Sequence, residues 1–243
     1  IMDYFSDFNY LNFIDELDKN GYSFLPSIKK LNNFDQIIDL ANKELIEKTY
    51  LESSKSHALL EETLDLKNNL EPVLFSYAKK QLNFKGSIDN QYKISRHVLP
   101  GKSSEAYRGH FDSHIFTIVF PILIPSNVNH DGSLIAFPKI KSDTTSEIIN
   151  IFQKIYFKIF SNEKGLNFLS SRKKNINFNF LDFKPLVFLG RTTFHCNYPL
   201  SSDSEHSRIT FLSHYFDRNP KYSIGNLLRL SLIHISEPTR PRI

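Results

Sequence analysis

The chain has 243 residues, of which 40 % are hydrophobic and 23 % are charged, a composition typical of a globular protein with a sizeable core. The net charge of +4 is small and no block of basic residues stands out, so no nucleic-acid partner is expected. The single Cys196 excludes an intramolecular disulfide and a Cys-rich zinc site. No apolar run reaches the roughly 18 residues of a membrane span, so we expect no membrane partner and a cytoplasmic protein.

The first part of the chain, residues 1–89, is predicted to be mainly helical. GYSFLPSI, after the first helix, predicts a short strand closed by Pro26. Asn33 and Gln36 have the spacing of a capping box at the start of the second helix. Apolar periodicity predicts three helices, the last interrupted near Pro72, over residues 4–19, 34–48 and 57–82.

From residue 90 onward the sequence alternates as strands do. One helical insertion is expected at about 144–170, opened by Thr144 and Glu147 at capping-box spacing. The predicted strands are QYKISRHVL, HFDSHIFTIVFPILI, GSLIAFP, KPLVFLG, RTTFHCNYPL and SRITFLSHYFD. This order predicts an α+β protein with flanking N-terminal helices and a barrel or two-sheet jelly roll over residues 90–216.

The stretch RGHFDSHIFT, residues 108–117, contains the candidate metal ligands. If it is a strand, His110 and Asp112 share a face, because successive residues point to opposite sides. His195, from another predicted strand, is the best candidate for a third ligand. Two His and one carboxylate form the facial triad of non-haem Fe(II) oxygenases.

Other interpretations of this stretch remain open. A His-x-Asp pair alone is weak evidence, since such residues are common in loops and at strand ends. His114 lies on the same alternation face and is a rival ligand. A hydrolytic zinc site formed by His110, Asp112 and His114 would leave His195 and Arg208 without a role.

Arg208 and Thr210 follow thirteen residues after His195, in SRITFLSHYF. Their i, i+2 spacing places them on one face of a strand. A guanidinium matches a carboxylate and a Thr hydroxyl can add a hydrogen bond. A buried Arg needs an anion, which a small dicarboxylic acid would supply.

Taken in order, HFD, GSLIAFP, FHCNYPL and RIT resemble the Fe(II)- and 2-oxoglutarate-dependent dioxygenases, and most of all the phytanoyl-CoA-dioxygenase-like branch. The resemblance covers about residues 90–216, and the opening helix followed by GYSFLP also suits this branch. It implies a double-stranded β-helix, a jelly roll with flanking helices. Gly132 and Leu134 would match the branch's usual Asn-Gly-x-Leu turn and strand.

The resemblance also implies roles for particular residues. His110, Asp112 and His195 would bind Fe(II), and Arg208 would pair with the distal carboxylate of 2-oxoglutarate, assisted by Thr210. The implied reaction uses O2, oxidises a C–H bond of a small-molecule substrate that could be anionic, and releases succinate and CO2. The alternative is a cupin-like jelly roll that binds a metal or ligand without oxygenase activity, such as an isomerase or a sensor.

Two features bear on the subfamily. The branch often follows the Asn-Gly-x-Leu strand with Pro-Gly-Ser-His, whereas this chain continues Pro138, Lys139, Ile140, Lys141. The halogenating relatives carry a small residue where this chain has Asp112, so hydroxylation is the better expectation.

Several further residues are secondary candidates. Arg96 and Tyr92 fall on one face of QYKISRHVL and could reach the co-substrate or the substrate, although an ordinary packing role is equally open. Thr117 could hydrogen-bond the co-substrate, but a packed strand Thr is the simpler interpretation. His214 is interpreted as structural or exposed, and Cys196 as a buried apolar residue turned away from the metal.

The end of the chain has a different character. LSLIHISEPTR, residues 230–240, resembles a translated sequencing adapter. We therefore expect one oxygenase-like domain over residues 1–229 and a non-native tail over residues 230–243.

Overall fold

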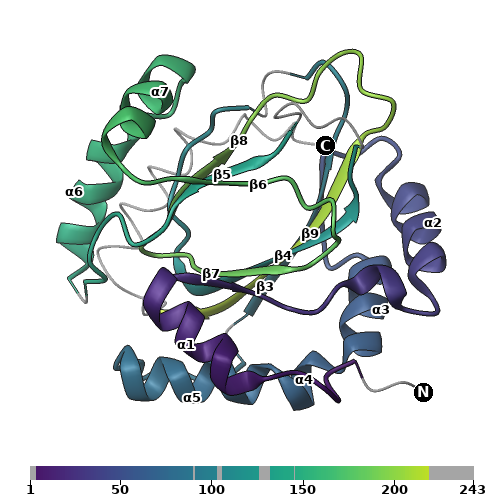
Figure 1. Ribbon diagram of the computed structural model, residues 1–243, viewed down its shortest axis with the longest axis horizontal. Coiled ribbons are helices and arrows are strands. Elements are labelled where there is room, and N and C mark those ends of the chain that lie inside the picture. The colour runs from purple at the N-terminus through teal and green to yellow at the C-terminus, as the bar shows by residue number, and fades with distance from the viewer. Residues whose placement is uncertain (1–3, 90, 103–105, 126–131, 145, 219–243) are drawn as a thin grey trace, which may run out of the picture.

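The computed structural model describes residues 4–89, 91–102, 106–125, 132–144 and 146–218. Within these residues the chain forms two antiparallel sheets flanked by helices, so the expected mixed α/β protein with antiparallel sheets is confirmed (Figure 1). The adapter-like tail lies outside the described residues. None of the described helices is long and apolar enough to cross a bilayer.

The larger sheet has six strands, and β9 lies between two long neighbours. β4 and β3 both pair with β9 along most of its length, with Phe120 opposite Phe211 on one side and Arg96 opposite Thr210 on the other. The strands lie in the order β1 (Tyr22–Phe24), β7 (Leu186–Leu189), β4 (His114–Leu123), β9 (Arg208–Asp217), β3 (Gln91–Val98) and β2 (Tyr50–Glu52). Two strands of the first 89 residues, β1 and β2, therefore form the edges of this sheet.

The smaller sheet lies over the inner face of the larger one (Figure 1). It has the order β6 (Ile176–Phe178), β5 (Leu134–Phe137) and β8 (Phe194–Asn197). Apolar residues of both sheets, including Val119 and Leu186 from the larger and Leu134 and Phe178 from the smaller, form one buried cluster. Neither β2 nor β6 was expected from the sequence; each has three residues with little alternation, and neither is closed by a Pro as the strand in GYSFLPSI is.

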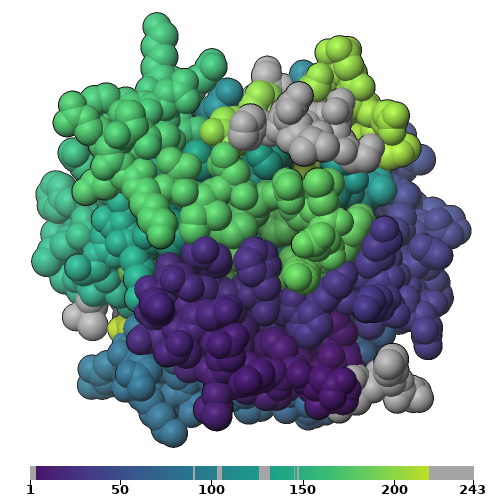
Figure 2. Space-filling model, viewed as in Figure 1, coloured from purple at the N-terminus to yellow at the C-terminus, as the bar shows by residue number. Residues whose placement is uncertain are grey.

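The N-terminal helices cover the outer face of the larger sheet (Figure 1), and Figure 2 shows the first residues of the chain forming a continuous surface with residues of its second half. Phe13, Leu17 and Leu74 belong to the same buried cluster as Phe116 and Phe211 of the sheet. Burial of each such side chain contributes about 1.5–3 kcal/mol. These helices are α1 (Tyr10–Asn20), α2 (Phe34–Leu45), α3 (Lys55–Leu64), α4 (Leu66–Asn69) and α5 (Glu71–Gln81), with a 3-10 turn at Ile28–Lys30.

The helix boundaries correct the sequence predictions in three places. α1 begins at Tyr10 rather than residue 4, because the Asn9 side chain accepts a hydrogen bond from the Asn12 amide. The Asn33 side chain does not cap α2 but donates to Thr63 Oγ1 at 2.7 Å. The long third helix is interrupted at Leu70, near Pro72 as expected, but also at Asp65, which has φ of 48° and was not expected to break it. Pro72 lies in the first turn of α5, where a missing N–H costs nothing.

The helical insertion consists of two helices rather than one, α6 (Glu147–Lys158) and α7 (Glu163–Arg172). The cap of α6 is Ser146, whose side chain accepts from the Ile149 amide, and the expected cap Thr144 instead accepts from the Ser146 amide at 3.1 Å. Asn162 caps α7 by accepting from the Gly165 amide at 2.8 Å.

A buried histidine links α3 to the larger sheet. His57 is buried, its ring stacks on Phe211 with centroids 4.8 Å apart, and its Nε2 lies 2.8 Å from Ser213 Oγ. Because Ser213 donates its proton to Glu61 Oε1, His57 Nε2–H is the donor in this pair. Burial, assisted by the Lys93 charge, lowers the pKa of His57 to about 3.

We predict that His57 makes the protein less stable in mild acid. The unfolded chain takes up a proton on this ring below about pH 6.5, while the folded chain does not until about pH 3. The stabilisation is therefore complete above pH 6.5 and is lost as the pH falls toward 3. Between pH 7.5 and 5, urea unfolding should show a loss of about 2 kcal/mol more for the wild type than for His57→Gln. His206→Gln, at an exposed position, should keep the wild-type slope, and equal slopes for all three proteins would contradict the prediction.

Candidate metal centre

Three side chains meet where the two sheets come together. The candidate ligand atoms of His110, Asp112 and His195 all lie within 4.8 Å of one another. His110 Nε2 is 3.6 Å from Asp112 Oδ1, and His195 Nε2 is 3.8 Å from Asp112 Oδ2. Among the described residues, no other group of three His, Cys, Asp or Glu side chains is arranged this closely.

The backbone explains why these residues converge. β4 begins only at His114, so His110 and Asp112 precede the strand in which the sequence placed them. The amide of His110 donates to the His195 carbonyl, and the amide of His195 donates to the His110 carbonyl, both at 3.1 Å. The Asp112 amide donates to the Gly190 carbonyl at 3.1 Å. The segment is thus attached to β8 and to the turn between β7 and β8.

Both imidazoles present the same nitrogen to the shared centre. His110 Nδ1 lies 2.8 Å from the Arg108 carbonyl, and His195 Nδ1 lies 3.2 Å from the Thr193 carbonyl. A carbonyl oxygen only accepts, so each Nδ1 carries the proton and each Nε2 keeps its lone pair. Such carbonyl contacts fix the tautomer and ring orientation of metal-binding histidines.

Asp112 is held by Thr117, for which the sequence suggested a packing role or a hydrogen bond to the co-substrate but not a contact with Asp112. Thr117 Oγ1 donates to Asp112 Oδ2 at 2.5 Å and lies 3.0 Å from His214 Nδ1. The hydroxyl has one proton, so it accepts from His214. Gly190 leaves the space for this contact, since a Cβ there would lie 2.9 Å from Asp112 Cβ and 3.0 Å from Thr117 Oγ1.

The electrostatics favour an ionised carboxylate at this position. Burial alone would raise the pKa of Asp112, but the rings of His195, His214 and His110, together with the Thr117 hydroxyl, hold it well below its usual value. Asp112 and His195 side chains are each 9 % exposed, whereas the His110 side chain is 55 % exposed. The centre is therefore buried on one side and open to solvent at His110.

The other candidate residues lie further along the inner face of the larger sheet. Arg208 and Thr210 are both buried on β9, and Arg96 of β3 stands directly opposite Thr210. Arg96 Nη1 donates to Asn197 Oδ1 at 2.9 Å, which connects β3 to β8. The structure thus brings Arg96 beside Thr210, a pairing that depends on the register of β3 with β9 and was not predicted.

Tyr92 and His114 lie beside His214 rather than among the three candidate ligands. The Tyr92 hydroxyl donates to Glu52 Oε1 at 2.9 Å, and its ring lies over His214 with centroids 5.8 Å apart. The His114 ring is 6.4 Å from that of Tyr92 and does not belong to the three-residue group. On β3, Tyr92 and Arg96 therefore lie beside different parts of β9.

Sequence reasoning missed three residues at this centre. The His214 side chain is only 12 % exposed and its Nδ1 lies 3.8 Å from Asp112 Oδ2, a contact that the interpretation as structural or exposed did not include. Phe188 presents its ring to His195 at 4.9 Å, and Asn197 contacts Arg96. The sequence could have indicated His214, because it is separated from Arg208 and Thr210 by an even number of positions and therefore lies on the same face of the strand. Cys196 behaves as expected, buried beside Phe111 and Phe194, and burial raises its pKa to about 12.

Comparisons with known proteins give the fold. No family model matches the sequence, and no curated protein matches it either. Three similar solved structures are a prolyl-4-hydroxylase of Pseudomonas putida, a prolyl hydroxylase of Trichoplax adhaerens in complex with a peptide of hypoxia inducible factor, and SnoN, a non-heme alpha-ketoglutarate-dependent epimerase from nogalamycin biosynthesis.

Their TM-scores are 0.51, 0.55 and 0.53, and each is 11 % identical to this chain. The alignments cover 87 %, 86 % and 88 % of this chain and 100 %, 89 % and 87 % of those proteins. At this identity, the likeness shows that the chain has the fold of these oxygenase-type structures over nearly its whole described length.

We predict that Thr117 controls metal affinity through Asp112. Thr117→Val keeps the shape of the side chain but removes the proton donated to Asp112 Oδ2. Loss of such a contact should weaken Co²⁺ binding, measured by calorimetry, by about 10- to 100-fold. Thr117→Ser should restore most of the affinity. Equal affinities for the wild type and Thr117→Val would contradict this role.

Proposed function

We propose that the protein is an Fe(II)- and 2-oxoglutarate-dependent oxygenase that oxidises a C–H bond of a small-molecule substrate, and that its two sheets form a double-stranded β-helix. One observation carries the proposal. The His110, Asp112 and His195 group lies where β8 meets the segment before β4, and the buried Arg208 and Thr210 lie on β9 beside β3, whose Arg96 donates to Asn197 of β8. The order of the motifs supports the phytanoyl-CoA-dioxygenase-like branch as the subfamily.

The three-residue group fits Fe(II). Two imidazole Nε2 atoms and one carboxylate form the donor set that leaves positions open on the ion. With Fe(II) bound, 2-oxoglutarate and O2 would supply the oxidation, and the co-substrate would leave as succinate and CO2. Thr117 and the backbone carbonyls of Arg108 and Thr193 would keep the ligands oriented.

β9 provides the geometry for a dicarboxylate. His214 and Thr210 lie on the same face of β9, four positions and about 14 Å apart along the strand. A five-carbon diacid can extend from the metal toward the Arg208 guanidinium, because the Arg side chain covers the remaining distance. Arg208 is only 4 % exposed, and its planar guanidinium is suited to binding a carboxylate with two parallel hydrogen bonds.

The Arg208–Thr210 pair distinguishes the oxygenase from the cupin-like alternative. A metal-binding isomerase or sensor would use the same His and Asp ligands, but it has no need of a buried guanidinium beside a hydroxyl. We propose that the substrate is a small molecule that could be anionic.

The test is succinate formation by the purified protein with Fe(II), 2-oxoglutarate, ascorbate and O2. Enzymes of this kind usually turn over slowly without substrate. We expect succinate from the wild type and from His206→Ala, none from His110→Ala, and a raised KM for 2-oxoglutarate in Arg208→Ala. Absence of succinate from a wild type shown to bind the metal would favour the cupin-like alternative.

Gly132 leads to a second prediction. It has φ of +68°, and an added Cβ would lie 3.2 Å from Arg208 Nη1 and 3.3 Å from Leu200 Cδ1. Gly132→Ala should displace the guanidinium and raise the KM for 2-oxoglutarate about tenfold, which corresponds to a loss of about 1.4 kcal/mol in binding free energy. The metal affinity should stay unchanged, because Gly132 does not contact the candidate ligands.

Gly101→Ala is the matched control. Gly101 also has positive φ, +75°, but its added Cβ would meet only Ser202 at an ordinary 3.5 Å. Both variants carry the same backbone strain, so equal KM values in the two would contradict the role given to Gly132.

A further inference from the structure

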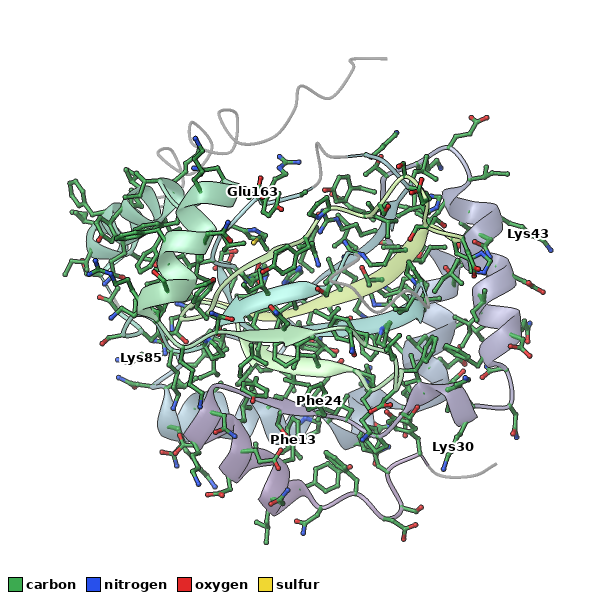
Figure 3. All side chains as sticks on the ribbon, turned by 45° about the horizontal axis from the view of Figure 1, so that its top comes forward. Phe13, Phe24, Lys30, Lys43, Lys85 and Glu163 are labelled. Carbon is green, nitrogen blue, oxygen red and sulfur yellow. The ribbon has the colours of Figure 1, made fainter. Side chains whose placement is uncertain are left out.

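α6 exposes an apolar face. Its six outward residues are each between 48 and 67 % exposed, and Phe168 of α7 is 53 % exposed. Figure 1 places α6 and α7 at one end of the sheets, away from α2, and Figure 3 shows their side chains extending outward near the labelled Glu163. The six residues follow helical spacing and form one stripe: Ile148, Ile149, Phe152, Ile155, Tyr156 and Ile159.

The opposite, inward face of α6 is partly polar. Asn150 is buried, and Lys141 donates to Asn150 Oδ1 at 2.9 Å and to Gln153 Oε1 at 3.1 Å. Burial, followed by the charge of Arg191, lowers the pKa of Lys141 to about 8. A surface helix normally places its apolar stripe toward the core and its polar face outward. In α6 the widest apolar stripe faces outward, so core packing does not account for it.

Basic residues border the apolar stripe. Phe160 links it to α7 by stacking on Phe168, with centroids 6.2 Å apart. Lys164, Phe168 and Arg172 share one face of α7, and the Arg172 guanidinium lies 5.2 Å from the centre of the Phe168 ring. The segment 147–174 contains six Lys or Arg and two Glu, a net charge of +4 that equals the net charge of the whole chain.

The size and charge of this surface indicate what covers it. The seven exposed apolar side chains present on the order of 700 Å², taking roughly 200 Å² for each full side chain, which exceeds the usual apolar patch of a monomer. A second copy would bring two positively charged segments together. An anionic bilayer would receive the apolar side chains at its headgroup–acyl boundary and neutralise the basic residues around them.

We propose that α6 and α7 form a docking surface for anionic membranes, with the stripe of α6 and Phe168 inserted and Lys158, Lys164, Arg172, Lys173 and Lys174 on the lipid headgroups. The sequence expectation of no membrane partner was based on the lack of a spanning run, which a helix lying in the bilayer surface does not need. The proposal goes beyond the oxygenase function and does not rest on it.

The docking surface adjoins the candidate metal centre. Ser161 Oγ donates to the Gly109 carbonyl at 2.7 Å, and Phe157 packs against Phe111 with centroids 5.1 Å apart. Phe111 stands between His110 and Asp112 in the sequence. Docking would therefore bring the segment with two candidate ligands to about one helix diameter, roughly 10 Å, from the membrane surface.

The test is flotation of the full chain with lipid vesicles. Vesicles of phosphatidylcholine with about 30 % phosphatidylserine should bind the protein at about 0.1 M salt, pure phosphatidylcholine should bind far less, and about 1 M salt should release it. Binding that ignores phosphatidylserine and salt, or no binding to either vesicle, would overturn the proposal.

Paired variants locate the surface. Phe152→Ser with Ile155→Ser, and separately Lys164→Glu with Arg172→Glu, should each weaken vesicle binding at least about tenfold. The matched controls are Leu11→Ser with Ile46→Ser, at positions 86 % and 74 % exposed on and beside other helices, and Lys30→Glu with Lys43→Glu. The controls should bind as the wild type does.

Two results would show that the surface has another role. Equal weakening in the control variants would mean that binding is not localised to α6 and α7. A dimer in sedimentation equilibrium at micromolar concentration that Phe152→Ser with Ile155→Ser converts to monomer, without vesicle binding by the wild type, would show that a second copy covers the stripe. All four variants change exposed positions, so circular dichroism should confirm the wild-type fold.

Discussion

The candidate centre depends on the reciprocal pair of backbone hydrogen bonds between His110 and His195. These residues are 85 positions apart in the chain, yet each amide donates to the carbonyl of the other at 3.1 Å. The pair fixes the spacing of two rings on opposite segments, and the carbonyls of Arg108 and Thr193 then orient their nitrogens. Asp112 belongs to the same segment as His110, and its position is fixed by the hydrogen bond from its amide to the Gly190 carbonyl. The ligand geometry is thus set mainly by the main chain, which keeps the three donors together independently of a bound ion.

β9 connects this centre to the rest of the inner face. His214 at one end contacts the Thr117 that holds Asp112, while Thr210 and Arg208 occupy the other end, beside Arg96 of β3. The outer face of the same strand carries Phe211, Ser213 and Tyr215 into the helical layer. A single strand therefore connects the candidate metal centre, the Arg208–Thr210 pair and the core, because alternate residues point to its two faces. Its position between two long strands gives it the rigidity that a positioned site requires.

The parts of the fold and of the candidate site that depend on neighbouring residues in the sequence were predictable. The i, i+2 spacing placed Arg208 with Thr210, and the alternating runs located the strands of the second half. Long-range register was not predictable, because the meeting of Thr117 with His214 depends on the pairing of β4 with β9. The break at Asp65 was missed because a left-handed residue other than Gly has little sequence signature. The periodicity of α6 indicates an apolar face but not that this face points away from the core.

The central claim is that one site binds Fe(II) through His110, Asp112 and His195 and holds 2-oxoglutarate by Arg208. The most direct measurement is visible absorption of the protein mixed anaerobically with Fe(II) and 2-oxoglutarate, where chelation of the metal by the keto acid produces a charge-transfer band. The account predicts a band for the wild type, no band for His195→Ala, and a band that needs more 2-oxoglutarate for Arg208→Ala. Tight Fe(II) binding without a band would contradict it and leave a metal-binding jelly roll without this co-substrate.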